Sequence, residues 1–210
     1  TREFSKKNHN LIKELSKQVG KWIYILNLPI FLIMILFPGS IINLFFGEKY
    51  LIAAGVLRIL SIGGFVSSLV FLSTDLISMI GKSKLILINT IGASILDIIL
   101  NFLLIPKYGL EGAAIATTIV WIIISIALFF EVKHYVNIIP LRKKMLRITL
   151  ASMFPLGLVL LIKPFVIINL ASLILLGLFF LLCYLLLLLV TKSFDRNDLL
   201  ILKSLKKRIR

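Results

Sequence analysis

The most unusual residues of this sequence are polar side chains that recur inside stretches otherwise suited to lipid. At 100° per residue, five such positions fall within an arc of about 140° of one helix. Lipid cannot satisfy these groups, so the stripe must face a cavity or another helix. In a cavity it would line a hydrophilic path, and in packing it would supply interhelical hydrogen bonds. The length of the stripe favours the cavity. Its members are Asn89, Thr90, Ser94, Asp97 and Asn101.

Two further charges, Asp75 and Arg58, lie in a second apolar stretch. A charge near the bilayer centre costs roughly 3 kcal/mol on insertion scales and usually faces protein or water. Asp75 could line a path, or it could reach cytoplasmic water or Lys82. Arg58 could meet an anionic group in a central cavity, or it could snorkel outward. They are 17 residues apart in sequence, about 25 Å along a helix, so they do not form a pair.

The sequence shows no catalytic constellation. It contains no Ser-His-Asp set, no phosphate-binding glycine loop and no metal-ligand motif, so we expect neither an enzyme nor a bound metal or cofactor. His9 and His134 lie in basic segments, where we expect them to be solvated. The single cysteine, Cys183, lies in a Leu-rich stretch and is expected to be an inert apolar residue.

The composition indicates an all-α, polytopic transmembrane helix bundle. The chain is 60% hydrophobic, with a mean hydropathy of +1.07, and many apolar runs reach about 18 residues or more. The second predicted span is long, and its Gly63-Gly64 pair could kink it. The six predicted spans are about 22–38, 51–80, 85–105, 110–131, 147–163 and 168–190.

A tight turn is predicted between the third and fourth spans, in "LNFLLIPKYGLEGAAIATTI" (residues 100–119). The chain breaks at Pro106 and turns at Gly109. Glu111 suits a helix N-terminus, where a carboxylate is favourable. The small residues that we expect to let the two helices pack closely are Gly109, Gly112, Ala113 and Ala116.

The net charge of +15 is explained by topology. Most lysines and arginines fall in residues 1–21, 81–84, 132–147 and 192–210, which alternate with nearly uncharged connections. The positive-inside rule puts both termini of this segment in the cytoplasm, beside the anionic lipids of a cytoplasmic membrane. Binding of nucleic acid is not needed to explain the basic charge.

Four segments follow from this pattern. Residues 1–21 form a basic amphipathic segment, residues 22–146 a lobe of four spans, residues 147–191 two additional helices, and residues 192–210 a basic amphipathic tail. Both basic segments place apolar residues at helical spacing and are expected to lie on the inner leaflet; the alternative is a solvated, frayed chain. Because the sequence starts at Thr1, we expect it to be part of a longer chain.

Part of the chain resembles a known protein family. The stretches that carry the resemblance are "INLFFGEKY", "LRIL", "GKSK" and "LNFLLIPKYGLEGAAIATTI". They are similar to the C-terminal half of polysaccharide-export flippases. These are the Wzx/RfbX-like proteins of the multidrug/oligosaccharidyl-lipid/polysaccharide exporter superfamily. The resemblance covers about residues 20–135, and the helix–turn–helix around Gly109 is its specific part. It implies one lobe of a two-lobed transporter plus two extra C-terminal helices.

The resemblance also implies a substrate and a mechanism. Such proteins move a polyprenyl-pyrophosphate-linked oligosaccharide across the cytoplasmic membrane by alternating access, through a cavity that needs the missing N-terminal lobe. Family members often carry Asn near the position of Asp97. A carboxylate there, or at Asp75, could bind H+ or Na+ and couple transport, or Asp97 could hydrogen-bond as the amide would. Arg58 is the candidate contact for the anionic headgroup.

Other functions remain open at this stage. One is a cation-coupled small-molecule exporter of the same superfamily, although the basic tail and the extra helix pair favour the flippase. Another is a structural or assembly subunit whose polar stripe only packs against partners. A membrane-embedded glycosyltransferase would need an acidic catalytic motif in a loop, which the sequence lacks.

Overall fold

The computed structural model describes residues 9–137, 144–162 and 170–191. Every regular element in these ranges is a helix, which confirms the predicted class. The chain divides into two compact units, Thr1–Arg142 and Lys143–Arg210. Five helical stretches are long and apolar enough to cross a membrane, judged by length and composition.

The first unit begins with α2 (His9–Leu36), a single helix that contains Pro29. The sequence predicted a basic segment followed by a separate span from residue 22. The structure has no break there, because the amphipathic pattern from His9 onward is itself helical and continues directly into the apolar run. A short helix α3 (Pro38–Phe46) and a 3-10 helix η1 (Glu48–Ala53) follow, separated at Gly47 by a φ of 88°.

The second predicted span consists of two helices, α4 (Ala54–Leu69) and α5 (Phe71–Met79). A kink was expected at Gly63-Gly64, but α4 runs through both glycines and the break lies at Val70. Gly63 instead lets another helix come close: a Cβ there would lie 3.0 Å from both the Thr118 Cα and the Trp121 ring. The glycine therefore serves helix packing.

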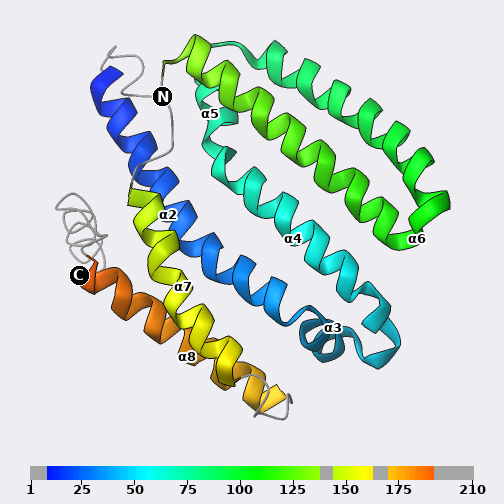
Figure 1. The fold of residues 1–210 in the computed structure, drawn as a ribbon. Helices are drawn as coiled ribbons and strands as arrows, with labels where there is room; N and C mark the ends of the chain where they lie inside the picture. The colour runs from blue at the N-terminus through cyan, green and yellow to red at the C-terminus, as the bar shows by residue number, and fades with distance from the viewer. Residues whose placement is uncertain (1–8, 138–143, 163–169, 192–210) are drawn as a thin grey trace, which may run out of the picture. The chain divides into compact units, whose positions relative to one another are not determined.

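The helix α6 (Ser83–Tyr135) folds back on itself at Gly109, where φ is 56° and ψ is −131°. Its two arms, 83–108 and 110–135, correspond to the third and fourth predicted spans. The five long apolar stretches of the described residues therefore include all six predicted spans. Helical conformation continues through Pro106, and the turn itself is at Gly109. Figure 1 shows the two arms lying antiparallel, with the second arm between α4 and the first arm.

In the first unit, α4 packs against both α2 and α6, and α5 packs against α6. Figure 1 shows these helices side by side in the order α2, α4, α6. A buried apolar cluster joins three of the helices, with members Ile12, Leu76, Ile77, Leu128 and Val132. Near the ends of α6, the Lys82 ammonium lies 3.8 Å from the centre of the Tyr135 ring, a cation–π contact that ties the two arms together.

The second unit consists of α7 (Lys144–Ile162) and α8 (Leu170–Val190), which pack against each other. Their bounds agree with the predicted spans within a few residues. Phe180 and Tyr184 on α8 have nearly parallel rings with centroids 6.2 Å apart. The predicted basic tail, residues 192–210, lies outside the described residues.

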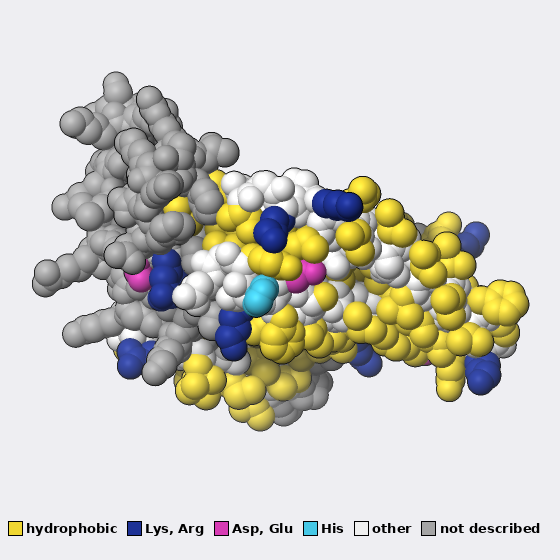
Figure 2. Space-filling model, turned by 90° about the horizontal axis from the view of Figure 1, so that it is seen from above, with side chains coloured by type: hydrophobic (Ala, Val, Ile, Leu, Met, Phe, Trp, Pro, Cys, Tyr) yellow, Lys and Arg dark blue, Asp and Glu magenta, His cyan; other side chains and the backbone are white. Residues whose placement is uncertain are grey.

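The described surface is strongly apolar. On the first arm of α6, Ile98 is 69% exposed and Phe102 is 81% exposed. Figure 2 shows hydrophobic side chains covering much of the described surface on the face it displays, with separate Lys and Arg side chains scattered among them and near the edges. Contiguous apolar surface of this kind is rare on water-soluble monomers, and it suits contact with lipid.

Candidate functional site

The polar stripe lies partly along the seam between the two arms of α6. At one position the Asn89 side-chain amide donates to both carboxylate oxygens of Glu131, at 2.9 Å each. At another the Thr117 hydroxyl donates to Asp97 Oδ1 at 3.3 Å. Each arm therefore contributes one carboxylate and one neutral hydrogen-bond donor to the seam.

The other stripe residues bond within their own helix. The Thr90 hydroxyl donates to the Ile86 carbonyl, the Ser94 hydroxyl to the Thr90 carbonyl, and the Asn101 amide to the Asp97 carbonyl. Thr90 and Ser94 are exposed, whereas Asn89, Asp97 and Asn101 are half-buried. The stripe thus has a packed edge toward the second arm and an open edge away from it. Part of it serves interhelical bonding, and the open edge is what a hydrophilic path would use.

Arg58 and Asp75 do not join this seam. Both side chains are exposed, on α4 and α5 respectively. Among the described residues, no hydrogen bond or ion pair connects either of them to Asp97 or Glu131. The ammonium of Lys82, one candidate partner of Asp75, lies over Tyr135 instead.

The small residues of the turn have distinct positions. A Cβ on Gly112 would collide with the backbone carbonyl of Leu104 on the facing arm. Ala116 is completely buried, whereas Ala113 is half-buried. Gly109 has open space around its Cβ position, so its contribution is the positive φ of the turn rather than a close contact.

Glu111 was expected as a helix cap. In the structure its carboxylate lies where a Cβ on Gly55 of α4 would be. The second arm therefore meets α4 at several levels. Further along, the Thr118 hydroxyl donates to the Ile59 carbonyl at 3.1 Å, close to where Gly63 admits the same arm. These contacts pack the second arm of α6, which carries half of the seam, against α4.

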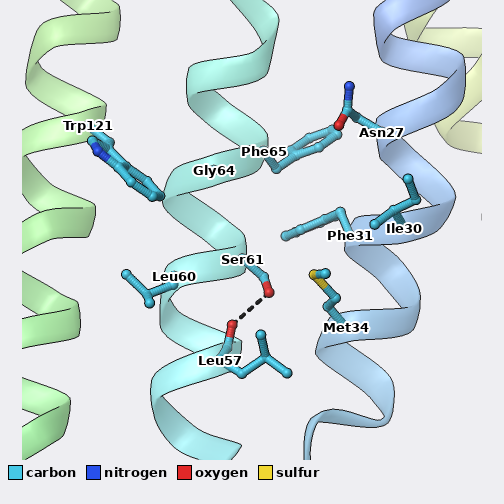
Figure 3. Close-up of a pocket in the computed structure, with 10 residues that line it drawn as sticks. All are labelled: Asn27, Ile30, Phe31, Met34, Leu57, Leu60, Ser61, Gly64, Phe65 and Trp121. Carbon is cyan, nitrogen blue, oxygen red and sulfur yellow. Dashed lines mark hydrogen bonds between the residues drawn. The ribbon is translucent and has the colours of Figure 1, made fainter. Parts of the chain in front are cut away.

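A cavity of about 310 Å³ lies between α2, α4 and the second arm of α6. Figure 3 shows Phe31 and Phe65 stacked in it, with Trp121 approaching from α6. Its polar side chains are already bonded to their own helices: Ser61 to the Leu57 carbonyl and Asn27 to the Ile23 carbonyl. The cavity is therefore predominantly apolar. It is lined by Asn27, Ile30, Phe31, Met34, Leu57, Leu60, Ser61, Gly64, Phe65 and Trp121.

A second cavity of about 240 Å³ continues along α4 beyond Trp121. It is lined by Gly64, Ser67, Ser68, Phe71 and Trp121. Gly64 and Trp121 border both cavities. The Ser68 hydroxyl donates to the Phe65 carbonyl within α4, so this hydroxyl also is bonded to its own helix.

Sequence reasoning did not identify Glu131 and Thr117 as the hydrogen-bond partners of the stripe. Folding the chain about Gly109 would have brought Glu131 close to Asn89, because the two lie 22 and 20 positions from that turn. The same fold puts Thr117 in the arm that faces Asp97. The cavities could not be found in this way, because their linings come from three helices and consist of residue types that are ordinary in any span.

These features describe a multi-pass membrane protein whose described spans contain a polar interhelical seam. The chain is 34% identical over 139 residues to an uncharacterized membrane protein of Methanocaldococcus jannaschii, covering 66% of this chain and 27% of that protein. It is 32% identical over 111 residues to a Shigella flexneri protein named "Putative O-antigen transporter", covering 51% of this chain and 27% of that protein. The chain thus spans about a quarter of the length of these relatives. No protein-family model matches the chain, and no solved structure matches it.

Proposed function

We propose that this chain is part of a membrane transporter that flips a polyprenyl-linked oligosaccharide across the cytoplasmic membrane by alternating access. The observation that carries the proposal is the relationship to the protein named as an O-antigen transporter, which extends over half of this chain. O-antigen is a polysaccharide, so the relationship favours a glycan substrate over a small molecule. The protein would act as a transporter and not as an enzyme.

In this proposal the two-lobed cavity needs residues beyond this chain. The relatives are about four times as long as the region that matches, which is length enough for a further lobe. We place that lobe N-terminal to these helices. The sugar and pyrophosphate would cross in the cavity between lobes while the isoprenoid tail stays in the bilayer. The partners are therefore the lipid-linked oligosaccharide, membrane lipids and the rest of the same polypeptide.

The polar stripe is the proposed substrate path. Ser94 on its exposed edge, and the half-buried Asn89, Asp97 and Asn101 beside it, would offer hydrogen bonds to sugar hydroxyls. Arg58 would contact the anionic headgroup, because it is a cation well inside an apolar stretch. Asp97 or Asp75 would bind the H+ or Na+ that couples transport.

A cation-coupled exporter of small molecules is the second candidate. The carboxylate of Asp97 in a membrane span, bonded to Thr117, favours cation coupling whatever the substrate. A structural or assembly subunit is the third candidate, favoured by the bonding of the same seam across the hairpin. It predicts that substitutions in the seam change stability and leave no transport phenotype.

Complementation tests the proposal. The full-length coding sequence is expressed in a bacterial strain that lacks its own O-antigen flippase, and surface polysaccharide is measured by gel and lectin staining. Restored polysaccharide supports the flippase. Normal membrane expression with no surface glycan, together with gained resistance to cationic dyes, would favour the small-molecule exporter.

A further inference from the structure

We propose that the junction of α4 and α5 at Val70 is a hinge, and that these two helices straighten into one in a second conformation. This inference goes beyond the proposed function, since it concerns how the chain moves whatever the protein carries. It rests on the backbone at Val70, one orphaned hydroxyl, the packing on either side and the neighbouring cavity.

The break is not dictated by local sequence. Kinks in helices usually occur at proline or glycine, but the residues here are Leu69, Val70 and Phe71. Val70 has φ −110° and ψ 8°, outside the helical region but without strain. Around it the hydrogen bonds shorten to three-residue spans: Val70 N–H donates to the Ser67 carbonyl at 3.2 Å, and Ser73 N–H to the Val70 carbonyl at 2.8 Å. An unbroken helix is therefore accessible to this stretch.

The Ser73 hydroxyl lacks the hydrogen bond that a continuous helix would give it. Its oxygen is fully buried and, among the described residues, is the buried side-chain polar atom with no hydrogen-bond partner. Other hydroxyls in the helices of this chain donate to the carbonyl four residues earlier. They include Ser61, Thr90, Ser94 and Ser125, at 2.6 to 2.9 Å.

The matching acceptor for Ser73 would be the carbonyl of Leu69, the last residue of α4. In a continuous helix that carbonyl lies within reach of both the Ser73 amide and its hydroxyl. Straightening would therefore close the backbone ladder and satisfy the buried hydroxyl together. An orphaned hydroxyl is costly, and most so in a membrane span, so this change favours the straight form.

Packing favours the bent form. α5 places Leu76 and Ile77 in the buried cluster with Leu128 and Val132 of α6. α4 is held separately by the same arm of α6, where Thr118 bonds the Ile59 carbonyl. The break lets the two helices keep both contacts. Core packing and helix continuity thus oppose each other at Val70, which is the balance that a two-state element requires.

There is room for the motion. The cavity of about 240 Å³ lies directly beside the junction and is bordered by Ser67, Ser68 and Phe71. Figure 1 shows α5 leaving the axis of α4 at this point. The side chain of Phe71 is 65% exposed, so it can turn with the backbone without displacing a packed neighbour.

Distance measurements between spin labels test the hinge. In a Cys183→Ala background, cysteines replace Ile62 on α4 and Met79 on α5, both of which are exposed. A continuous helix would hold these two positions about 25 Å apart along its axis, and the bend at Val70 brings them closer. The labelled full-length protein is studied in lipid nanodiscs, where we expect two distance populations.

Ser73→Ala removes the orphaned hydroxyl, so it should favour the bent form. We expect the ratio of short to long distances to rise by a factor of about five or more. Ser68→Ala is the matched control, because that hydroxyl is bonded within α4, to the Phe65 carbonyl, and should not alter the ratio. A single distance population in the unsubstituted protein overturns the hinge, and so does an equal shift in the two variants. Neither result depends on transport, so the proposed function would stand.

Discussion

The Asn89 side-chain amide donates to both carboxylate oxygens of Glu131, at 2.9 Å each, across the two arms of α6. These residues are 42 positions apart in sequence. The Thr117 hydroxyl, 20 positions beyond Asp97, donates to its carboxylate in the same seam. A hairpin in lipid lacks a hydrophobic driving force between its arms, so packing and bonds of this kind set its register.

Asn89→Ala should loosen the hairpin. The substitution removes the amide that donates to the Glu131 carboxylate across the hairpin. Interhelical hydrogen bonds in membrane bundles contribute about 0.6 kcal/mol on average, with a maximum near 1.7. We expect the free energy of unfolding to fall by about 1 kcal/mol. Equilibrium unfolding in mixed micelles measures it. Thr90→Ala is the control, since that hydroxyl bonds only within its own helix. Equal losses of stability in both variants would contradict a role for the Asn89–Glu131 bond.

Asp97→Asn separates cation coupling from hydrogen bonding. The amide oxygen can still accept from Thr117, so the fold should keep its stability, but the side chain can no longer carry a proton or bind a cation strongly. We expect transport by the full-length protein to fall about tenfold or more, with an unchanged unfolding temperature. The measurement is surface polysaccharide in the complemented strain.

Asp97→Ala is the comparison, because it removes the acceptor as well and should lose both stability and transport. If Asp97→Asn transports as well as the parent protein, the carboxylate acts only as a hydrogen-bond acceptor. The same two variants bear on the assembly-subunit alternative, which expects a change in stability alone.

Gly112→Ala should destabilise the turn of α6. The added methyl group would collide with the Leu104 carbonyl, a backbone atom that cannot rotate away. We expect a loss of about 1–3 kcal/mol from overpacking. Gly92→Ala is the matched control on the first arm, where the Cβ position has open space. That variant should be neutral or more stable by about 0.5–1 kcal/mol, because alanine is the better helix former. Equal effects of the two would show that the arms are not closely packed at Gly112.

The spans and the turn at Gly109 were predictable because each depends on neighbours in sequence. Long apolar runs gave the positions of α7, α8 and the arms of α6 within a few residues, and Gly109 marked the turn because only glycine readily adopts its conformation. The break at Val70 was not predictable. It has no proline or glycine signal, and contacts of α4 and α5 with α6 hold it.

The candidate site was predictable only in part. Helical spacing placed Asn89 and Asp97 on one stripe, but their partners Glu131 and Thr117 depend on how the hairpin folds back. Arg58 and Asp75 were selected by the same reasoning, from charge inside an apolar stretch, and the structure leaves both exposed and apart from the seam. Charge in a span shows that a residue needs a partner or water, but it does not say where that partner lies.

Arg58→Gln tests the proposed contact with the substrate headgroup. A charge-assisted hydrogen bond to a pyrophosphate would contribute about 2 kcal/mol, so its loss should weaken transport about tenfold or more. Arg58→Lys should retain part of the activity, because the cation remains while the two-pronged geometry is lost. Lys49→Gln is the control, since it removes an exposed cation from η1 in the same unit. Transport is measured in the complemented strain at matched expression. Normal transport by both Arg58→Gln and Arg58→Ala would mean that the guanidinium only snorkels toward the membrane surface and takes no part in binding.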